Sequence, residues 1–491
     1  MYFTVGRYYD KMEFMEIDPA IKNYVRTWSE QGAARLANKL TDARGQKHYV
    51  RFPYFRLQKL LDDFRTKGKS EPRWVVMTGA RGTGKTTILA QLHAYLLKQQ
   101  FPLQNILYLV LDEAKQVVGA NLQQLLAAIE EEHGAFELQK APFVLLLDEV
   151  HIDAEWASAI KSLYERTKNV FVICTGSSAV SLMINPDVTR RAHIEKIVPM
   201  SLPEYRMLRE RKTPTWQLKE KIETALYTSS SAQHCLKSLQ TLQSDVEAFW
   251  KPLPQDYLKH YILCGTLPFT VPLENEQEVY QRIITTLQQI VLKDLPLSAA
   301  FDSHTLNSAL RALLIVAGSD TISLQNIAGA IGSISAPTIS KLLDAFVNAE
   351  VLVAVPPRVG SARGAVVRSP KYHFLSPSYR AALLAEIGLL KFDTHCGLLL
   401  QDTAMLYLHK IGRIKGLIRV SYDPSEGGTD FILGRDSKQI PLEIGWGQKT
   451  VRQAISRVGA GEGDYGLVVS NSTLSIVENV VHVPLKMFLL S

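Results

Sequence analysis

The chain has 491 residues, 46% of them hydrophobic and 21% charged, which is ordinary for a globular protein and suggests about three domains. No apolar run reaches the roughly 18 residues of a membrane span, and the N-terminus lacks a signal-peptide pattern, so we expect a cytoplasmic protein without membrane segments. The four cysteines are scattered without paired spacing, which is typical of core residues. The net charge of +7 is compatible with an anionic partner but does not demonstrate one.

Residues 1–50 form an N-terminal extension rich in aromatic and charged side chains. The stretch NYVRTWSEQGAARLANKL within it is predicted to be helical. This extension could serve as a docking arm or as a cap on the domain that follows.

A phosphate-binding loop is the strongest motif of the chain. In RWVVMTGARGTGKTTILAQL, an apolar strand leads into Gly79-x-x-x-x-Gly84-Lys85-Thr86 and then into a helical pattern, which is the context that a P-loop requires. Backbone N–H groups of such a loop bind phosphates, Lys85 would reach the β- and γ-phosphates of ATP, and the Thr86 hydroxyl would ligate Mg²⁺. The predicted nucleotide-binding residues of this loop are Gly79, Ala80, Arg81, Gly82, Thr83, Gly84, Lys85, Thr86 and Thr87.

Two further apolar strands end in polar residues. The run FVLLLDEVH suits a buried strand of a parallel sheet and ends in Asp148 and Glu149. Asp148 would hold the Mg²⁺ shell, and Glu149 would polarise the attacking water. The run NVFVICTGSS ends near Thr175 and Ser177, which would contact the γ-phosphate or the water, or would simply form a turn.

Six segments in order resemble one family: GARGTGKTT, LLLDEVHIDAEWASAIKSLYE, CTGSSAVSL, RRAHIEKIVPMSLPEY, YILCGTLPF and VVRSPKYHFLSPSYRAALL. The family comprises bacterial and archaeal AAA-superfamily P-loop ATPases whose C-terminal domain of unknown function is related to PD-(D/E)xK nucleases. The resemblance covers roughly residues 52–491 and implies an α/β ATPase core over residues 51–205. It places Arg191 on the family arginine, as a γ-phosphate contact or a surface ion pair.

Helical patterns over residues 206–302 predict a helical lid. Residues 303–382 read as three short helices and a strand-rich hairpin, which is the order of a winged helix. Ser335 and Thr338 begin its third helix, where DNA contacts would fall, although Lys341 is the sole positive charge of that helix. The hairpin carries four basic residues that phosphates could recruit, or that are merely solvated: Arg358, Arg363, Arg368 and Lys371.

Residues 383–491 resemble the nuclease-like domain, with α/β character of the restriction-endonuclease type. Asp430 and Glu443, on two strands joined by a turn, match the family acids and would hold a metal. Gln401 replaces the family glutamate, and an amide binds a hard cation more weakly than a carboxylate. Gly445 stands in place of the lysine, and Lys449 is too far along to substitute on an extended strand. We therefore expect a degenerate domain that does not cleave nucleic acid.

These observations predict an ATP- and Mg²⁺-dependent AAA-type switch or oligomeric motor. It would act on double-stranded DNA through the winged helix, or on a protein client, and it would form a homo-oligomer. Two alternatives stay open: an ATP-gated metal-dependent nuclease, and a nucleotide-controlled signalling scaffold that binds no nucleic acid.

Overall fold

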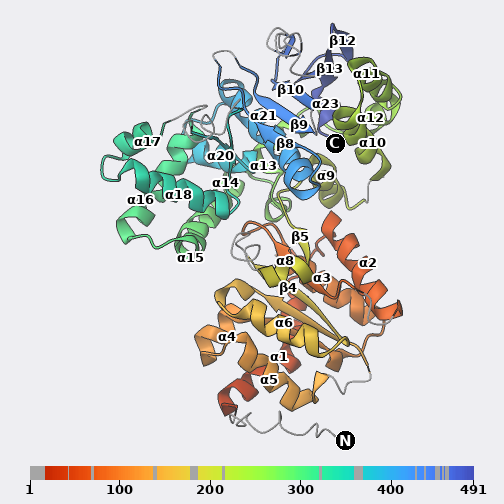
Figure 1. Cartoon of the computed structure of the whole chain (residues 1–491), viewed down its shortest axis with the longest axis vertical. Coiled ribbons are helices and arrows are strands. Elements are labelled where there is room, and N and C mark those ends of the chain that lie inside the picture. The colour runs from red at the N-terminus through yellow and green to blue at the C-terminus, as the bar shows by residue number, and fades with distance from the viewer. Residues whose placement is uncertain are drawn as a thin grey trace, which may run out of the picture.

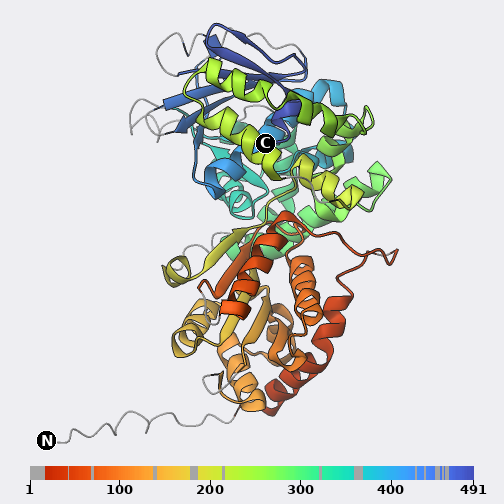
Figure 2. The ribbon, with the colours of Figure 1, turned by 90° about the vertical axis from the view of Figure 1, so that its right-hand side faces the viewer.

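The structure, a computed structural model, describes residues 17–42, 44–67, 71–136, 141–176, 186–212, 216–319, 323–358, 369–425, 428–435, 438–447, 454–455, 458 and 464–491. The chain folds into two lobes, one above the other in Figure 1 and still separate after the 90° turn of Figure 2. Each lobe has its own hydrophobic core. One core extends from Ile21 to Ile197 and the other from Met200 to Leu490.

The first lobe is built on a five-stranded parallel sheet of order β2-β3-β4-β1-β5. Its strands are β1 (Trp74–Thr78), β2 (Ile106–Val110), β3 (Phe143–Asp148), β4 (Val170–Gly176) and β5 (His193–Lys196). The central strands β1, β3 and β4 are buried throughout, as their apolar sequences predict. Because the strands are parallel, their carboxyl ends meet at one edge, and the predicted P-loop and acidic residues lie there.

Helices cover both faces of this sheet. They are α1 (Pro19–Ala37), α2 (Phe52–Lys67), α3 (Lys85–Lys98), α4 (Leu111–Val118), α5 (Leu122–His133), α6 (Trp156–Arg166) and α8 (Pro186–Arg191), with short 3₁₀ turns at Leu103–Asn105 and Val150–Ile152. Helix α1 packs against α5 and β2, and its Trp28 is buried with its ring 5.4 Å from that of Tyr108. Of the two roles considered for the extension, residues 19–37 therefore act as a cap on the core, whereas residues 1–16 lie outside the described ranges.

The helices between residues 202 and 298 pack against two different parts of the second lobe. They are α9 (Leu202–Glu210), α10 (Trp216–Thr228), α11 (Ala232–Gln240), α12 (Gln243–Trp250), α13 (Tyr257–Cys264), α14 (Glu276–Gln289) and α15 (Leu295–Ser298), with a 3₁₀ turn η4 (Pro268–Thr270) and a π-helical turn η5 (Ile290–Asp294). Helices α11 and α12 pack on C-terminal elements, and the Trp250 indole donates to the Lys486 carbonyl at 2.9 Å. Helices α13 and α14 pack on α20 (Pro377–Glu386) instead. The segment predicted as one lid thus contacts two different parts of the second lobe.

Three helices and a hairpin follow in the order that was expected for residues 303–382. They are α16 (Ser303–Ala317), α17 (Leu324–Ile331), α18 (Ala336–Asn348), and the antiparallel pair β6 (Leu352–Val355) and β7 (Lys371–Phe374). Ser335 caps α18: its hydroxyl accepts from the Thr338 N–H at 3.3 Å and lies 2.9 Å from the Thr338 hydroxyl. Arg363 and Arg368 lie outside the described residues.

The C-terminal part has a six-stranded mixed sheet of order β12-β13-β11-β10-β9-β8. Its elements are α21 (Phe392–His409), a π-helical turn η6 (Lys410–Ile414), β8 (Arg419–Ser421), β9 (Phe431–Arg435), β10 (Lys438–Ile444), β11 (Gly466–Ser470), β12 (Ser475–Val477), β13 (Val480–Pro484) and α23 (Leu485–Phe488). Strands β9 and β10 form the hairpin that carries the two predicted acids, and β10 ends before Trp446 as its sequence suggested. Lys449 lies outside the described residues.

Candidate nucleotide-binding site

The P-loop connects β1 to α3 at the carboxyl edge of the first sheet. Gly84 has φ of 90° at the N-cap of α3, a left-handed conformation that glycine adopts without the cost that a Cβ would add. The loop therefore turns sharply and presents the first N–H groups of α3. Backbone donors at a helix N-terminus are suited to bind an anion such as a phosphate.

Lys85 is the first residue of α3 and is buried. Its ammonium donates to the carbonyls of Gly79 at 2.7 Å and Ala80 at 3.0 Å. Burial lowers its pKa, and the nearby carboxylates of Glu149 and Asp148 oppose that shift. The ammonium is thus held inside the loop, where it can turn toward a bound phosphate.

The Asp148 carboxylate, at the end of β3, accepts hydrogen bonds from hydroxyl groups of three other elements. Thr86 of α3 donates to its Oδ2 at 2.8 Å, Tyr108 of β2 donates to the same oxygen at 3.2 Å, and the Thr175 hydroxyl donates to Oδ1. The predicted Mg²⁺ ligands Thr86 and Asp148 are therefore adjacent. A hydroxyl and a carboxylate are the oxygen donors that Mg²⁺ takes in such sites. Sequence reasoning missed Tyr108, whose signal was a single phenol in the otherwise aliphatic strand ILYLV.

Glu149 follows Asp148 in a left-handed conformation with φ of 57°, which is uncommon outside glycine and often marks functional residues. Its N–H donates to the Thr175 hydroxyl at 3.1 Å, which ties it to β4. Its buried Oε2 has no hydrogen-bond partner in the described part of the chain and lies 3.3 Å from His151 Nδ1. Burial raises the pKa of Glu149 and lowers that of His151 to about 4, so this histidine is neutral near pH 7. The Glu149 side chain is 24% exposed, and a carboxylate that keeps one unsatisfied oxygen is placed to accept a proton or orient a water.

A cavity of about 450 Å³ opens beside these groups, a volume suited to a small-molecule ligand. Its wall includes the P-loop residues Arg81, Gly82, Gly84, Lys85, Thr86 and Thr87 together with Glu149. Residues before α2, such as His48 and Tyr49, line another side. The second lobe contributes Pro268 and Phe269. The candidate nucleotide site is therefore closed by both lobes.

Arg51 and Glu204 form a buried ion pair beside the P-loop that sequence reasoning missed. The guanidinium makes two contacts of 2.9 Å with the Glu204 carboxylate, and it also donates to the carbonyls of Thr83 and Val198. Both side chains are at most 5% exposed. Arg51 thereby fixes the P-loop backbone against the start of the second lobe. Arg51 lies outside the motifs of the chain, and Glu204 lies in the segment RRAHIEKIVPMSLPEY, which does not show what it pairs with. Their packing reveals the connection.

Arg191 lies far from the P-loop of its own chain. Strand β5 runs parallel to β1 with His193 beside Val75, so residues before His193 lie at the edge of the sheet opposite to the loop that follows Thr78. Arg191 donates to Glu165 at 2.7 Å, the surface ion pair that was one of its two expected roles. Ser177, the other predicted sensor, lies outside the described residues, whereas Thr175 is in the site.

Comparisons with known proteins place these observations in a family. A family profile described as an AAA domain matches residues 71–206, the segment that holds the P-loop, Asp148, Glu149 and Thr175. A second profile, a domain of unknown function (DUF8612), matches residues 255–389. The uncharacterized protein MJ1637 of Methanocaldococcus jannaschii is 31% identical over 451 residues, covering 91% of this chain and 90% of the relative.

The chain belongs to the family of MJ1637, and its residues 71–206 match an AAA domain. The expected α/β fold with a P-loop ATPase core is confirmed for this AAA-domain protein. None of the helices in the described part of the chain has the length and apolar character that a membrane crossing requires.

Solved structures show weaker likenesses. The Walker-type ATPase PABY2304 of Pyrococcus abyssi matches with a TM-score of 0.39 at 13% identity, over 67% of this chain and 94% of that one. The Orc1 protein of Aeropyrum pernix, solved in complex with DNA, gives 0.32 at 12% identity, over 69% and 93%. The RuvB Holliday junction branch migration motor of Thermotoga maritima gives 0.29 at 15% identity, over 63% and 90%.

At the predicted metal site of the C-terminal sheet, the Asp430 carboxylate accepts hydrogen bonds from protein groups. The Gln401 amide of α21 donates to Asp430 Oδ1 at 3.0 Å, and the Ile444 N–H donates to Asp430 Oδ2 at 2.9 Å. Glu443 of β10 is 1% exposed. Asp402, the next residue on α21, points away from Asp430 and accepts two hydrogen bonds from Arg380. Within the described ranges, no group of three or more histidine, cysteine, aspartate or glutamate side chains could hold a metal ion.

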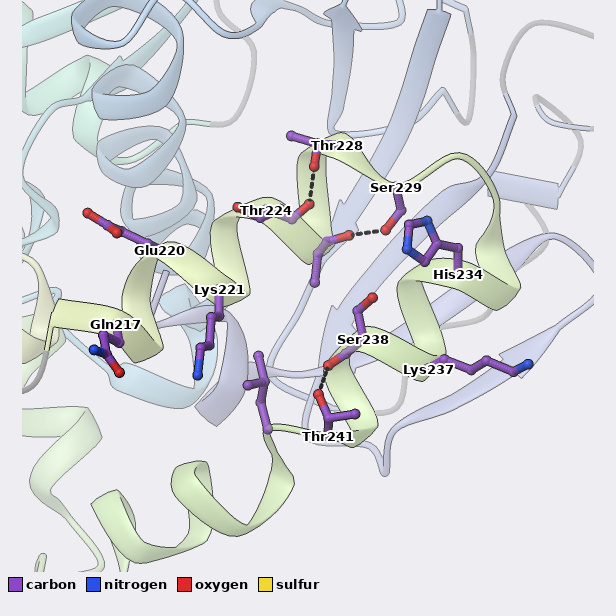
Figure 3. A pocket seen from close by; sticks show the side chains of 12 residues that line it. Gln217, Glu220, Lys221, Thr224, Thr228, Ser229, His234, Lys237, Ser238 and Thr241 are labelled. Carbon is purple, nitrogen blue, oxygen red and sulfur yellow. Dashed lines mark hydrogen bonds between the residues drawn. The ribbon is translucent and has the colours of Figure 1, made fainter.

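A second cavity, of about 620 Å³, lies on α10 and α11 of the second lobe (Figure 3). Several hydroxyls on its wall donate back to carbonyls of their own helices, as Thr228 does to Thr224 and Thr241 to Ser238, both at 2.7 Å. Its wall includes none of the predicted site residues. These hydroxyls are therefore satisfied locally and do not by themselves indicate a ligand.

Proposed function

We propose that the protein is an ATP-hydrolysing, Mg²⁺-dependent AAA-type switch or oligomeric motor that acts on DNA or on a protein partner. The observation that carries this proposal is the convergence of Thr86, Asp148, Thr175 and Glu149 beside the P-loop cavity. A P-loop alone would support nucleotide binding. The carboxylate of Glu149, whose Oε2 has no hydrogen-bond partner among the described residues, supports hydrolysis in addition.

The roles of the residues follow from their positions. Lys85 would leave its loop carbonyls and bind the β- and γ-phosphates, and Thr86 with Asp148 would hold Mg²⁺. The ion, when bound, would neutralise part of the phosphate charge. Glu149 would orient the attacking water and accept its proton, and the Thr175 hydroxyl would keep Asp148 and Glu149 in place through its two contacts.

Arg191 fits this proposal only in an assembly. Since it lies at the edge of the sheet opposite to its own P-loop, a γ-phosphate contact would have to reach the nucleotide of a neighbouring copy. A catalytic arginine supplied by another molecule is an established way to stabilise phosphoryl transfer. This placement of Arg191 supports a homo-oligomer.

The second lobe would carry the partner site. The three helices and hairpin of residues 303–382 support a winged helix, in which Arg358 follows β6 and Lys371 begins β7. The mixed sheet with α21 supports a nuclease-like domain retained for binding, since Gln401 occupies the Asp430 carboxylate that would otherwise face a metal. Salt-dependent binding to duplex DNA would support a DNA partner, whereas no binding at low salt would favour the scaffold alternative.

ATP turnover by Lys85→Ala and Glu149→Gln tests the proposal. Lys85→Ala should abolish nucleotide binding, because a positioned ammonium is lost. Glu149→Gln should bind ATP but hydrolyse it at least about a hundredfold more slowly, because a general base typically contributes 10²- to 10⁴-fold. Lys98→Ala, at the exposed end of the same helix, is the matched control and should leave both unchanged. Undiminished turnover in Glu149→Gln would refute the assigned base.

A further inference from the structure

A side chain inside the P-loop is bonded to the second lobe. Arg81 Nε lies 3.2 Å from Asp294 Oδ2, and Arg81 Nη2 lies 2.9 Å from Asp294 Oδ1, so the carboxylate accepts a two-pronged contact. Asp294 is the last residue of the π-helical turn η5 and is 3% exposed, whereas Arg81 is 25% exposed. The matched AAA domain contains Arg81 and the matched domain of unknown function contains Asp294. The pair therefore joins two domains directly at the phosphate-binding loop.

The same face of the P-loop is covered by other groups of the second lobe. A Cβ on Gly82 would lie 2.7 Å from the Phe269 ring, and one on Gly84 would lie 3.5 Å from Pro268. The ion pair is thus part of a continuous contact between the loop and the segment from η4 to η5. If phosphate binding moved this loop, the segment from η4 to η5 would have to move or repack with it.

Arg81 also lines two cavities of the surface. It lines the 450 Å³ cavity of the nucleotide site and a smaller one of about 230 Å³, which Asp112 and Asp294 also line. Glu149 borders both cavities as well. Arg81 is therefore on the side of the nucleotide site where Glu149 would orient the attacking water, which is the γ-phosphate side.

The chemistry of guanidinium allows both contacts at once. It has five N–H donors in a planar fork, and Asp294 engages Nε and one donor of Nη2, so three donors remain on the outer edge. A buried ion pair is a weak source of stability because desolvating two charges offsets their attraction. Placing such a pair inside a phosphate-binding loop is better explained by orientation of the arginine than by stability.

We infer that Asp294 is a positioning residue for ATP hydrolysis: it holds Arg81 with its outer edge toward the γ-phosphate and so links phosphate occupancy to the second lobe. This inference rests on the proposed ATPase function. It assigns a role to a residue of the domain of unknown function that no motif of the chain indicated.

Steady-state ATP hydrolysis and ADP binding by the full-length protein test the inference. Asp294→Asn keeps the shape and removes the charge, and it should lower kcat by about tenfold to a hundredfold. The Kd for ADP should change by less than about threefold, because ADP lacks the phosphate that Arg81 would contact. Asp294→Glu should recover part of the rate. Asp112→Asn removes a carboxylate from the same small cavity without touching this ion pair, and should stay within about twofold of wild type.

A double-mutant cycle separates positioning from a general electrostatic effect. Arg81→Gln should lower kcat as Asp294→Asn does, and the double variant should be no slower than Arg81→Gln alone, because Asp294 acts only through Arg81. Additive losses would overturn the inference, and so would an unchanged kcat or an equal weakening of ATP and ADP in Asp294→Asn. If Asp294→Asn does not fold, Arg81→Lys provides the same comparison, since lysine keeps the charge but cannot make the two-pronged contact. Failure of the wild type itself to bind ATP would instead refute the proposed function, and the inference with it.

Discussion

Gly82 illustrates how a single position of the P-loop depends on the other lobe. Its φ of 81° is left-handed, and a Cβ there would lie 2.7 and 3.1 Å from two atoms of the Phe269 ring. The P-loop motif leaves this position unspecified between its two obligatory glycines. The need for glycine here comes from the backbone conformation together with a side chain almost 190 residues later.

Gly82→Ala should destabilise the protein more than the same change at a matched glycine. Gly119 has φ of 65° and open space around its missing Cβ, so Gly119→Ala carries only the backbone cost of about 1–2 kcal/mol. Gly82→Ala adds an overpacking cost of about 1–3 kcal/mol against Phe269. Thermal unfolding should give a lower Tm for Gly82→Ala than for Gly119→Ala. Phe269→Leu in the Gly82→Ala background should raise the Tm again, and equal Tm values for the two alanine variants would contradict the packing argument.

At the scale of elements, Arg380 and Asp402 join four pieces of the second lobe. Arg380 of α20 lies with its Nε 2.6 Å from Asp402 Oδ2 of α21, and it donates to the Ala317 carbonyl at the end of α16 at 2.6 Å. Asp402 also accepts from the Phe374 N–H of β7 at 3.0 Å. Both side chains are buried. The hairpin and the helices α16, α20 and α21 are therefore aligned by one buried charge network.

Asp402→Ala should destabilise the second lobe by about 3–5 kcal/mol, because it leaves the Arg380 guanidinium buried without its counter-charge. Asp393→Ala, at the first turn of the same helix, is the control and should cost far less. Denaturant unfolding followed by circular dichroism measures both. Removing both partners with Arg380→Met and Asp402→Leu should cost less than the sum of the single changes, and strict additivity would argue against a direct pair.

Successive residues of α21 serve unrelated purposes because neighbours on a helix point about 100° apart. Asp402 enters the charge network, whereas Gln401 donates to Asp430 on the β9–β10 hairpin. A glutamate at position 401 would place a second carboxylate at Asp430, as a metal site requires. The amide instead satisfies that carboxylate with a hydrogen bond.

At the scale of the whole molecule, the glutamine at position 401 in place of the family glutamate leads us to expect no nuclease activity. The purified full-length protein should not degrade plasmid DNA with Mg²⁺ or Mn²⁺, with or without ATP, because Gln401 and Gly445 lack the chemistry of a ligand and of an activating lysine. Gel analysis of wild type and Asp430→Ala measures this. Cleavage by wild type that disappears in Asp430→Ala would contradict the prediction, and equal background in both would indicate contamination.

The two lobes together enclose the candidate nucleotide site. The first lobe supplies the phosphate-binding loop and the acids, and the second supplies Phe269 and Asp294 against the same loop. In the switch or motor that we propose, a site shared in this way would let nucleotide binding change the relation between the lobes. The domain boundaries read from the sequence, with lid, winged helix and nuclease-like domain, stay predictions.

The sequence by itself determined the AAA-type core with its P-loop and the buried strand that ends in Asp148, because each of these signals is a short segment whose spacing reflects local backbone geometry. A strand, a tight turn and a helix leave a pattern within about 20 residues that survives without knowledge of the rest of the chain. The tertiary structure decided the remainder. Tyr108, Arg51, Glu204 and Asp294 reach the site from four separate segments, and their pairing depends on which faces pack together, which no local spacing encodes. For the same reason Arg191, whose motif position suggested the nucleotide, lies at the far edge of its own sheet.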